Sequence, residues 1–441
     1  MTRLGLIGSI LADRWQLRIF EPFEPFEPTE SLTPVSVRSS MGAVKRTLDS
    51  RVEEGGDVPR TYFTLVVAAV LAVATSGSTG AASSTATTGS NPTFKHIGTL
   101  AFGPDGVLFA ADGQEVSITA LQLAARMSGG VPGTKDIPAI DQKIAALLGV
   151  DVKNLAITDM VVNPKTRNTF ISVMRGQGAG ATPVLLRVDG AGKIDVVSLE
   201  GVKYSRIGMP NPPPAETPLV LGDRKIPVAN YPDKVDPKGL MGVQTITHMA
   251  FIDGKLYVSG LSNEEFASKM RVIPYPFVTA NNGASIEIYH GSHGQLETFS
   301  PVFTFVPYTI DGVPSIVASY LCTPLVKFPV SAFEPGSKVQ GTTIAEFGNR
   351  NRPVDMIVYK KNGQDFILMS NNVRGVMKVP TSPFGKASAI KTQIPNTAGV
   401  PFETVESMKG VQQLDLLDPS HALLLVQSSG GTVDLQAAEL P

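Results

Sequence analysis

The chain has 441 residues, of which 38 are Lys or Arg and 39 are Asp or Glu, so its charges almost cancel. This balance gives no electrostatic basis for binding nucleic acid or an anionic membrane surface. Because Cys322 is the single cysteine, an intramolecular disulfide is excluded, and the folded part must be stabilised by its own core.

The first 81 residues predict an unfolded extension followed by an export signal. Residues 1–59 contain the repeat FEPFEPFEP, whose prolines are incompatible with regular helix or sheet. Residues 60–81 combine Arg60, an apolar run from Phe63 to Ala74 and small residues after it, which is the pattern of a secretory signal peptide. The run is shorter than the roughly 20 apolar residues of a membrane span.

We therefore expect a periplasmic or extracellular protein with no stable membrane span after the signal is cleaved. Residues 1–59 would be disordered or a translated upstream extension. Because a signal peptide normally begins a protein, Met41 or Val58 would be the natural start. Residues 82–91, rich in Ser, Thr, Ala and Gly, predict a linker, so the folded domain would span residues 92–441.

Pairs of apolar strands joined by turns rich in Gly, Asp and Asn recur along this domain. They include HIGTLAFGPDGVLFAAD (96–112), ITDMVVNPKTRNTFISVM (157–174), ITHMAFIDGKLYVSG (246–260) and VDMIVYKKNGQDFILMS (354–370). Such turns are typical of β-hairpins. A further repeat aligns PSIVASYLCTPLVKFP (314–329) with DFILMSNNVRGVMKVP (365–380) without a gap.

The length of the repeat can be measured from one equivalent position in the second strand of each unit. This position falls at Ala111, Ser172, Ser259, Ser319, Ser370 and Ser428. The intervals are roughly 50–60 residues, except for one that holds a Pro-rich insertion at 209–218, and such a period is typical of propeller blades. The fold class expected is therefore all-β: a six-bladed β-propeller with four-stranded blades.

A single helical pattern interrupts the strands. Residues 139–149, AIDQKIAALLG, have apolar residues at helical spacing and a glycine at the end. We expect a small helical insertion between blades one and two. The C-terminal residues 431–440 predict a third strand, and no fourth strand follows. We therefore expect residues 91–96 to complete the last blade.

The segment LAFGPDGVLFAADG (100–113) resembles the strand-turn-strand signature of NHL-type and SMP-30/gluconolactonase-like six-bladed propellers. The resemblance covers the core of each blade and not the loops. It implies the fold, but these propellers include hydrolases, sugar oxidases and protein-binding modules. No position matches a complete catalytic set from any of them, so the catalytic residues are unknown.

The innermost strand of each blade lines the channel of a propeller. The equivalent polar positions here are Thr99, Asp159, His248, Asp355 and Gln413. Asp159, His248 and Asp355 are candidates for metal or ligand binding, and a divalent cation such as calcium is the cofactor that these residues suggest. The alternative is that they satisfy backbone groups of neighbouring blades.

Three further residues precede one of these strands. Arg350, Asn351 and Arg352 are expected at the entrance of the channel, where they would bind a small anionic or polyhydroxylated molecule; the alternative is a structural role. His290 and His293 resemble a metal pair, but their place in a hairpin favours a turn. Cys322 lacks an identifiable neighbouring base and is expected to be a structural thiol.

Two functions from different classes remain open. The first is a binding or scaffold module for a small polar ligand or a protein partner. The second is a metal- or cofactor-dependent propeller enzyme, either a lactonase-like hydrolase or a sugar oxidoreductase, with its site at the central channel. The sequence lacks haem, Walker, nucleophile-elbow and zinc-helix motifs, which favours the first.

Overall fold

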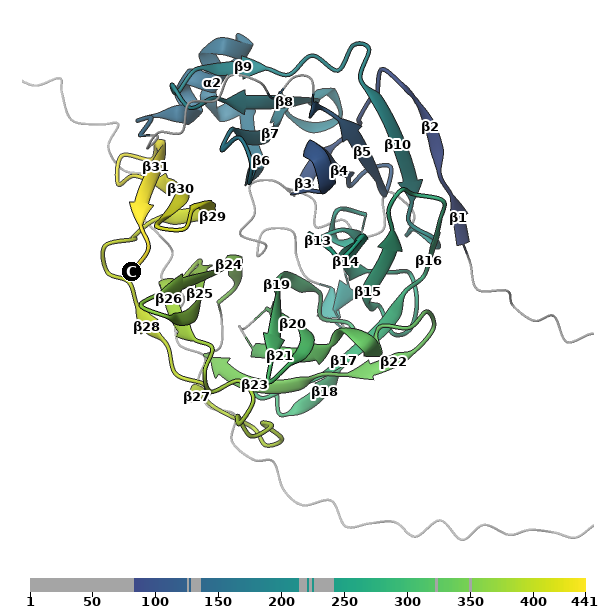
Figure 1. Ribbon diagram of the computed structural model, residues 1–441, viewed down its shortest axis with the longest axis vertical. Helices are drawn as coiled ribbons and strands as arrows, with labels where there is room; N and C mark the ends of the chain where they lie inside the picture. The colour runs from purple at the N-terminus through teal and green to yellow at the C-terminus, as the bar shows by residue number, and fades with distance from the viewer. Residues whose placement is uncertain are drawn as a thin grey trace, which may run out of the picture. The chain divides into compact units, whose positions relative to one another are not determined.

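The computed structural model describes residues 83–124, 127, 136–213, 220–221, 224–225, 242–321, 324–348 and 351–441. The expected extension and signal peptide, together with Arg350 and Cys322, lie outside these residues. Within them, six sheets of three or more strands are arranged around a common axis as a six-bladed β-propeller (Figure 1). The predicted fold class is confirmed.

The blades are numbered in the order in which the chain forms their innermost strands. Blade 1 contains β2 (Thr87–Ser90), β3 (Ile97–Phe102), β4 (Val107–Asp112), β5 (Ser117–Gln122) and β10 (Lys203–Gly208). Blade 2 contains β6 (Leu155–Val162), β7 (Thr169–Arg175), β8 (Thr182–Val188) and β9 (Ile194–Val196). Blade 3 contains β13 (His248–Ile252), β14 (Lys255–Leu261), β15 (Ser268–Pro274), β17 (Ala284–His290) and β18 (Gln295–Glu297), with β22 (Lys338–Gln340) parallel to β17.

The other three blades follow one another directly in the chain. Blade 4 contains β19 (Val302–Ile310), β20 (Val313–Tyr320), β21 (Pro324–Pro329), β23 (Thr342–Phe347) and β27 (Thr397–Gly399). Blade 5 contains β24 (Pro353–Lys361), β25 (Gln364–Asn371), β26 (Gly375–Pro380) and β28 (Glu403–Thr404). Blade 6 contains β29 (Val411–Asp418), β30 (His421–Gln427) and β31 (Val433–Glu439). Blades therefore vary around the expected four strands.

The remaining elements are short. β1 (Ser83–Thr85) pairs with β16 (Thr279–Asn281), and β11 (Val220–Leu221) pairs with β12 (Arg224–Lys225). The predicted helix is α2 (Ile140–Leu148), which lies between blades 1 and 2 in the chain. Single 3₁₀ turns occur at Pro104–Gly106, Val152–Asn154, Gly178–Gly180, Val243–Thr245 and Val330–Ala332. No described helix is long and apolar enough to cross a membrane.

The hairpins that begin the blades depend on residues that tolerate positive φ. Asp253 and Gly254 join β13 to β14 with φ of 47° and 78°, and Asn362 and Gly363 join β24 to β25 with φ of 52° and 78°. Positive φ at both central residues is the geometry of the turn that best matches the twist of an antiparallel pair. The Asp-Gly and Asn-Gly pairs in the sequence thus specify the strand pairing.

The ring order of the blades differs from their chain order. β3 of blade 1 packs against both β6 of blade 2 and β13 of blade 3, whereas β6 packs on its other side against β29 of blade 6. The ring therefore runs 2, 1, 3, 4, 5, 6 and back to 2 (Figure 1). The chain forms four strands of blade 1 (β2 to β5), then all of blade 2, and returns through β10 to pair with β5 of blade 1.

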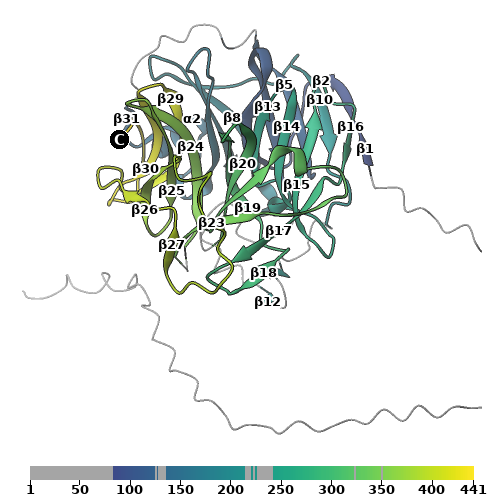
Figure 2. The ribbon, with the colours of Figure 1, turned by 60° about the horizontal axis from the view of Figure 1, so that its bottom comes forward.

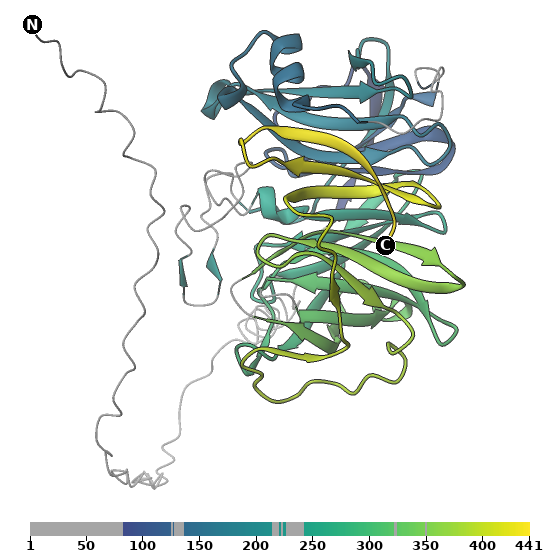
Figure 3. The same ribbon diagram turned by 90° about the vertical axis from the view of Figure 1, so that its left-hand side faces the viewer.

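Six hydrophobic clusters confirm this order, because each fills the joint between two blades that are neighbours in the ring. The joint between blades 6 and 2 contains Leu425 and Leu435 packed with Ile171 and Leu186. Figure 3 shows blade 6, in yellow, directly beside blade 2, and Figure 2 shows strands of successive blades standing side by side. No blade has a complete core of its own, so the blades stabilise one another.

Residues just before α2 complete the last blade. Ile137 bridges to Leu435 of β31 through two backbone hydrogen bonds, of 2.8 and 3.0 Å. The Ala139 N–H donates to Asp434 Oδ1 at 2.7 Å. The expectation that residues 91–96 would fill this place is wrong, because the strand before them, β2, pairs with β10 in blade 1. Residues 83–90, in the segment expected to be a linker, form β1 and β2.

Candidate functional site

The propeller has a central cavity of about 1080 Å³ that is lined by all six innermost strands. Each strand presents at least one side chain to it. These include Thr99 of β3, Asp159 of β6, His248 of β13, Phe305 of β19, Asp355 of β24 and Gln413 of β29. The five polar positions named from the sequence are all among the residues that line this cavity.

Asp159 binds the innermost strand of the neighbouring blade. Its Oδ2 accepts a hydrogen bond from the Leu100 N–H of blade 1 at 2.6 Å. Its Oδ1 accepts from the Met160 N–H at 2.8 Å and from Gln413 Nε2 of blade 6 at 3.1 Å. The side chain thus connects three blades, which is the structural role that the sequence left open.

Two other aspartates repeat this arrangement. Asp415 Oδ2 of blade 6 accepts from the Val162 N–H of blade 2 at 2.6 Å. Asp355 Oδ2 of blade 5 accepts from the Leu414 N–H of blade 6 at 3.5 Å. Each aspartate also caps the amide of the residue that follows it. Consecutive joints of the ring, from blade 5 through blades 6 and 2 to blade 1, are therefore held by the same type of contact.

The channel raises the pKa of all three carboxyl groups. Burial is the largest cause, since the ionised form loses its hydration. It raises the pKa of Asp159 to about 7 and that of Asp415 to about 6, although backbone N–H donors oppose the shift in both. The pKa of Asp355 lies well above its ordinary value, because burial acts together with repulsion from Asp159 and Asp415. The channel therefore holds carboxyl groups that are partly protonated near neutral pH.

His248 is neutral in this environment. Burial lowers its pKa to about 4, because the imidazolium would lose its hydration. The ring lies edge-on to Phe305, with the ring centroids 4.8 Å apart. Thr99 Oγ1 donates to the Thr247 carbonyl of blade 3 at 3.4 Å, so Thr99 also contacts a neighbouring blade.

The entrance residues divide into two kinds. Arg352 lines the cavity, and its guanidinium lies 5.2 Å from the centroid of the Phe303 ring. Asn351 is buried and is not among the lining residues; its Nδ2 donates to the Gly348 carbonyl at 2.7 Å, and its Oδ1 accepts from Asn371 at 2.9 Å. Asn351 therefore holds the loop, whereas Arg352, the other described residue of the three, lines the channel.

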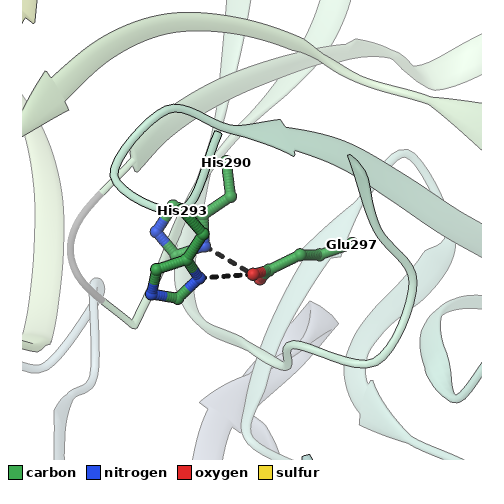
Figure 4. A group of neighbouring side chains, drawn as sticks. All are labelled: His290, His293 and Glu297. Atoms are coloured by element: carbon green, nitrogen blue, oxygen red, sulfur yellow. Dashed lines mark hydrogen bonds and ion pairs between the residues drawn. The ribbon is translucent and has the colours of Figure 1, made fainter. Parts of the chain in front are cut away.

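The spacing of potential ligand atoms indicates where a metal ion could bind. Across the described parts of the chain, the group of three His, Cys, Asp or Glu ligands that lies close enough to share an ion is His290, His293 and Glu297. This group is on an outer hairpin of blade 3 (Figure 4). Asp159, His248 and Asp355 line one cavity but do not form such a group.

Sequence reasoning missed Asp415 and Glu297. The repeat identified Gln413 as the channel position of β29, and Asp415 lies two residues further along the same strand, outside the repeated position. Glu297 is seven residues after His290, and in the β17–β18 hairpin it pairs with Ile288, two residues before His290 on the same strand. This pairing brings the Glu297 carboxylate to the His290 ring. Hairpin pairing was the signal that could have found it.

Comparisons with known proteins establish no family. No protein-family model and no curated protein matches the chain. One solved structure to which it is similar is that of the PQQ-bound form of aldose sugar dehydrogenase from Streptomyces coelicolor, at 11% identity and a TM-score of 0.27. The match covers 80% of this chain and 98% of that one. At these values the likeness adds nothing about activity, and the resemblance to NHL-type and SMP-30-like propellers is not confirmed beyond the six-bladed fold.

Proposed function

We propose that the protein is an exported binding module whose central channel takes a small, neutral molecule rich in hydroxyl groups. The observation that carries this proposal is the excess of hydrogen-bond acceptors in the channel. A carboxylate has about four lone-pair sites, and the contacts above use two of them on Asp355 and two on Asp415. Gln413 Oε1 is buried and has no hydrogen-bond partner among the described residues.

A hydroxylated ligand suits this set of groups better than an anion does. Hydroxyl groups donate to carboxylate and amide oxygens, and they accept from the same carboxyl groups when these are protonated. An anion would be repelled by whichever carboxylates are ionised, and the cations on the described wall are Arg352 and Lys153, of which Lys153 already pairs with Asp151. The neutral polyol is therefore favoured over the anionic ligand that the sequence also suggested.

Calorimetric titration of the purified protein with neutral sugars and polyols, sugar acids and amino sugars tests this function. We expect the neutral compounds to bind, and Asp159→Asn to weaken binding at least ~10-fold at pH 8, since one charged hydrogen bond is worth about 1.5–3 kcal/mol. Asp195→Asn is the matched control, because Asp195 lies on the outer strand β9 and pairs with Arg187 and Lys193. Selective binding of sugar acids, or equal loss in both variants, would refute the proposed ligand class.

A second candidate function is an enzyme that acts on a sugar or lactone in the same channel. The observation that favours it is the pKa of Asp159, since a carboxyl group with a pKa of about 7 is poised to transfer protons near neutral pH. Lactonase and sugar-oxidation assays over pH 5–9 test it. Turnover that Asp159→Asn abolishes and Asp195→Asn leaves unchanged would replace the binding module with the enzyme.

A further inference from the structure

The outer hairpin of blade 3 places three side chains together that have no part in the channel. His290 ends β17, Glu297 ends β18 and His293 lies in the turn between them. The His290 and Glu297 side chains are 1% and 2% exposed, whereas that of His293 is 44% exposed. Figure 1 places this hairpin at the outer edge of its blade, away from the innermost strands.

Both imidazole rings face the same carboxylate (Figure 4). His290 Nδ1 lies 2.8 Å from Glu297 Oε2, and His293 Nδ1 makes a short contact with Glu297 Oε1. The ring centroids are 4.0 Å apart. One atom from each residue can be chosen so that all three lie within 4.8 Å of one another, a separation that a central ion can span with bonds of about 2.0–2.2 Å.

The turn that carries the histidines is fixed from both sides. The Gly294 N–H donates to the His290 carbonyl at 2.8 Å, which closes the turn as the sequence predicted. Buried Glu346 of blade 4 accepts from the Gly291 N–H at 2.6 Å and from Ser292 Oγ at 3.2 Å. A Cβ on Gly291 would lie 2.9 Å from Glu346 Cγ, so this approach requires glycine.

We propose that His290, His293 and Glu297 form a binding site for a divalent transition-metal ion, with Zn²⁺ as the ion it takes. Two imidazole nitrogens and one carboxylate oxygen are ligands typical of Zn²⁺, whereas Ca²⁺ requires six to eight oxygen ligands. Three protein ligands leave one tetrahedral position for water. The ion would enter from the solvent-exposed side of His293.

The ion would replace the hydrogens that lie between the two Nδ1 atoms and the Glu297 carboxylate. In the metal-free protein a hydrogen on each Nδ1 can bridge to Glu297, and a nitrogen that coordinates the ion must give up that hydrogen. A neutral ring moves its proton to Nε2, and a charged ring releases one to solvent. The ion would therefore link the two strand ends and the turn, and would stabilise the attachment of this hairpin to blade 4 through Glu346.

Titration with Zn²⁺ alone tests the site. The full-length purified protein is treated with a chelator, dialysed, and titrated with Zn²⁺ by calorimetry, with metal content measured by mass spectrometry and the midpoint of thermal unfolding measured with and without the ion. We expect one Zn²⁺ per chain and a rise of several degrees in the midpoint, since a ligand that binds the native state stabilises it.

His293→Ala is the decisive variant, because this partly exposed side chain can be removed with the least damage to the core. His421→Ala is its matched control: His421 Nδ1 lies 3.0 Å from Asp418 Oδ1 on the β29–β30 hairpin, a His–carboxylate pair without a third ligand. We expect His293→Ala to weaken Zn²⁺ binding at least tenfold and to abolish the thermal shift, with no change for His421→Ala.

Two results would overturn the proposal. One is the absence of stoichiometric Zn²⁺ from the titrated wild-type protein, which would leave the cluster as a hydrogen-bonded structural group. The other is equal Zn²⁺ binding by wild type and His293→Ala, which would place the ion elsewhere. If His293→Ala fails to fold, Co²⁺ bound to the wild type decides the matter, because the absorption spectrum distinguishes tetrahedral nitrogen and oxygen ligation from the octahedral aquo ion.

Discussion

The central channel and the outer hairpin of blade 3 both bury carboxyl groups, but they affect them in opposite directions. In the channel, burial raises the pKa of Asp159 to about 7. At the hairpin, burial also acts to raise the pKa of Glu297, yet hydrogen bonds from His290 and His293 outweigh it and lower the value to about 2. Depth alone therefore does not determine the charge of a buried acid; its partners do.

The partners also explain what each region can do. Backbone amides hold the channel aspartates without neutralising them, so the cavity has acceptors for a ligand that can donate. Two imidazoles share one carboxylate at the hairpin, which places three potential metal ligands together. A buried carboxyl group thus suits polyol binding in one region and metal binding in the other.

The largest effect should come from Glu297→Gln in metal-free protein. The variant removes the carboxylate that both histidines face, and breaking a buried pair in this way costs about 3 kcal/mol of unfolding free energy. The loss should be complete above about pH 4.5 and should vanish as the pH falls to about 2, because a carboxyl group with a lowered folded pKa contributes stability only above its unfolded value.

Urea denaturation of wild type and Glu297→Gln between pH 2 and pH 8 measures this loss of unfolding free energy. Glu287→Gln is the control, since Glu287 lies on β17 of the same hairpin and its side chain accepts a hydrogen bond from Gln340 Nε2. Equal destabilisation by both substitutions would show that the histidine partners do not distinguish Glu297.

Asp159→Asn should remove a pH dependence of stability that is opposite in sign to that of Glu297. A raised folded pKa means that the native state binds more protons than the unfolded state between about pH 4 and pH 7, so wild-type stability falls as the pH rises through this window. The variant should lack this fall. Denaturation curves of the two proteins that keep a constant separation from pH 4 to pH 8 would contradict the assignment.

At pH 8, where the imidazole is neutral in both the folded and the unfolded state, the smallest effect on stability should be that of His248→Gln. Removing the edge-on contact with Phe305 costs about 1 kcal/mol. Because the folded pKa of His248 is about 4, wild-type stability rises between about pH 4 and pH 6.5 through this group, and the variant should lose that rise. A difference curve that is flat over this range would show that His248 is hydrated in the channel.

The blades, their turns and the helix could be predicted from the sequence because each is determined locally. Ser172, Ser259, Ser319 and Ser370 all lie in second strands, as the repeat predicted. Ser428 follows β30, so the alignment of the last blade was displaced. Gln413 pairs with Leu425, so Leu425 is the position in β30 that corresponds to the serines of the other second strands.

The ring order could not be predicted, because similar blades have similar faces and the sequence does not say which two faces pack. Contacts between residues far apart in the chain decide it, such as Asp159 with Leu100 and Asp415 with Val162. For the same reason the sequence identified Asp159 and Asp355 as channel residues without showing that their oxygens bind backbone amides. Glu297 required the strand pairing that brings it to His290.

The charge states of the two regions can be measured directly. Protein labelled with ¹³C at the Asp and Glu carboxyl carbons is titrated by NMR from pH 2 to pH 9, with Asp159→Asn and Glu297→Gln used to assign the two signals. The account predicts a midpoint of about 7 for Asp159 and about 2 for Glu297. Titration of both groups near pH 4, the ordinary value for an exposed carboxyl group, would contradict it.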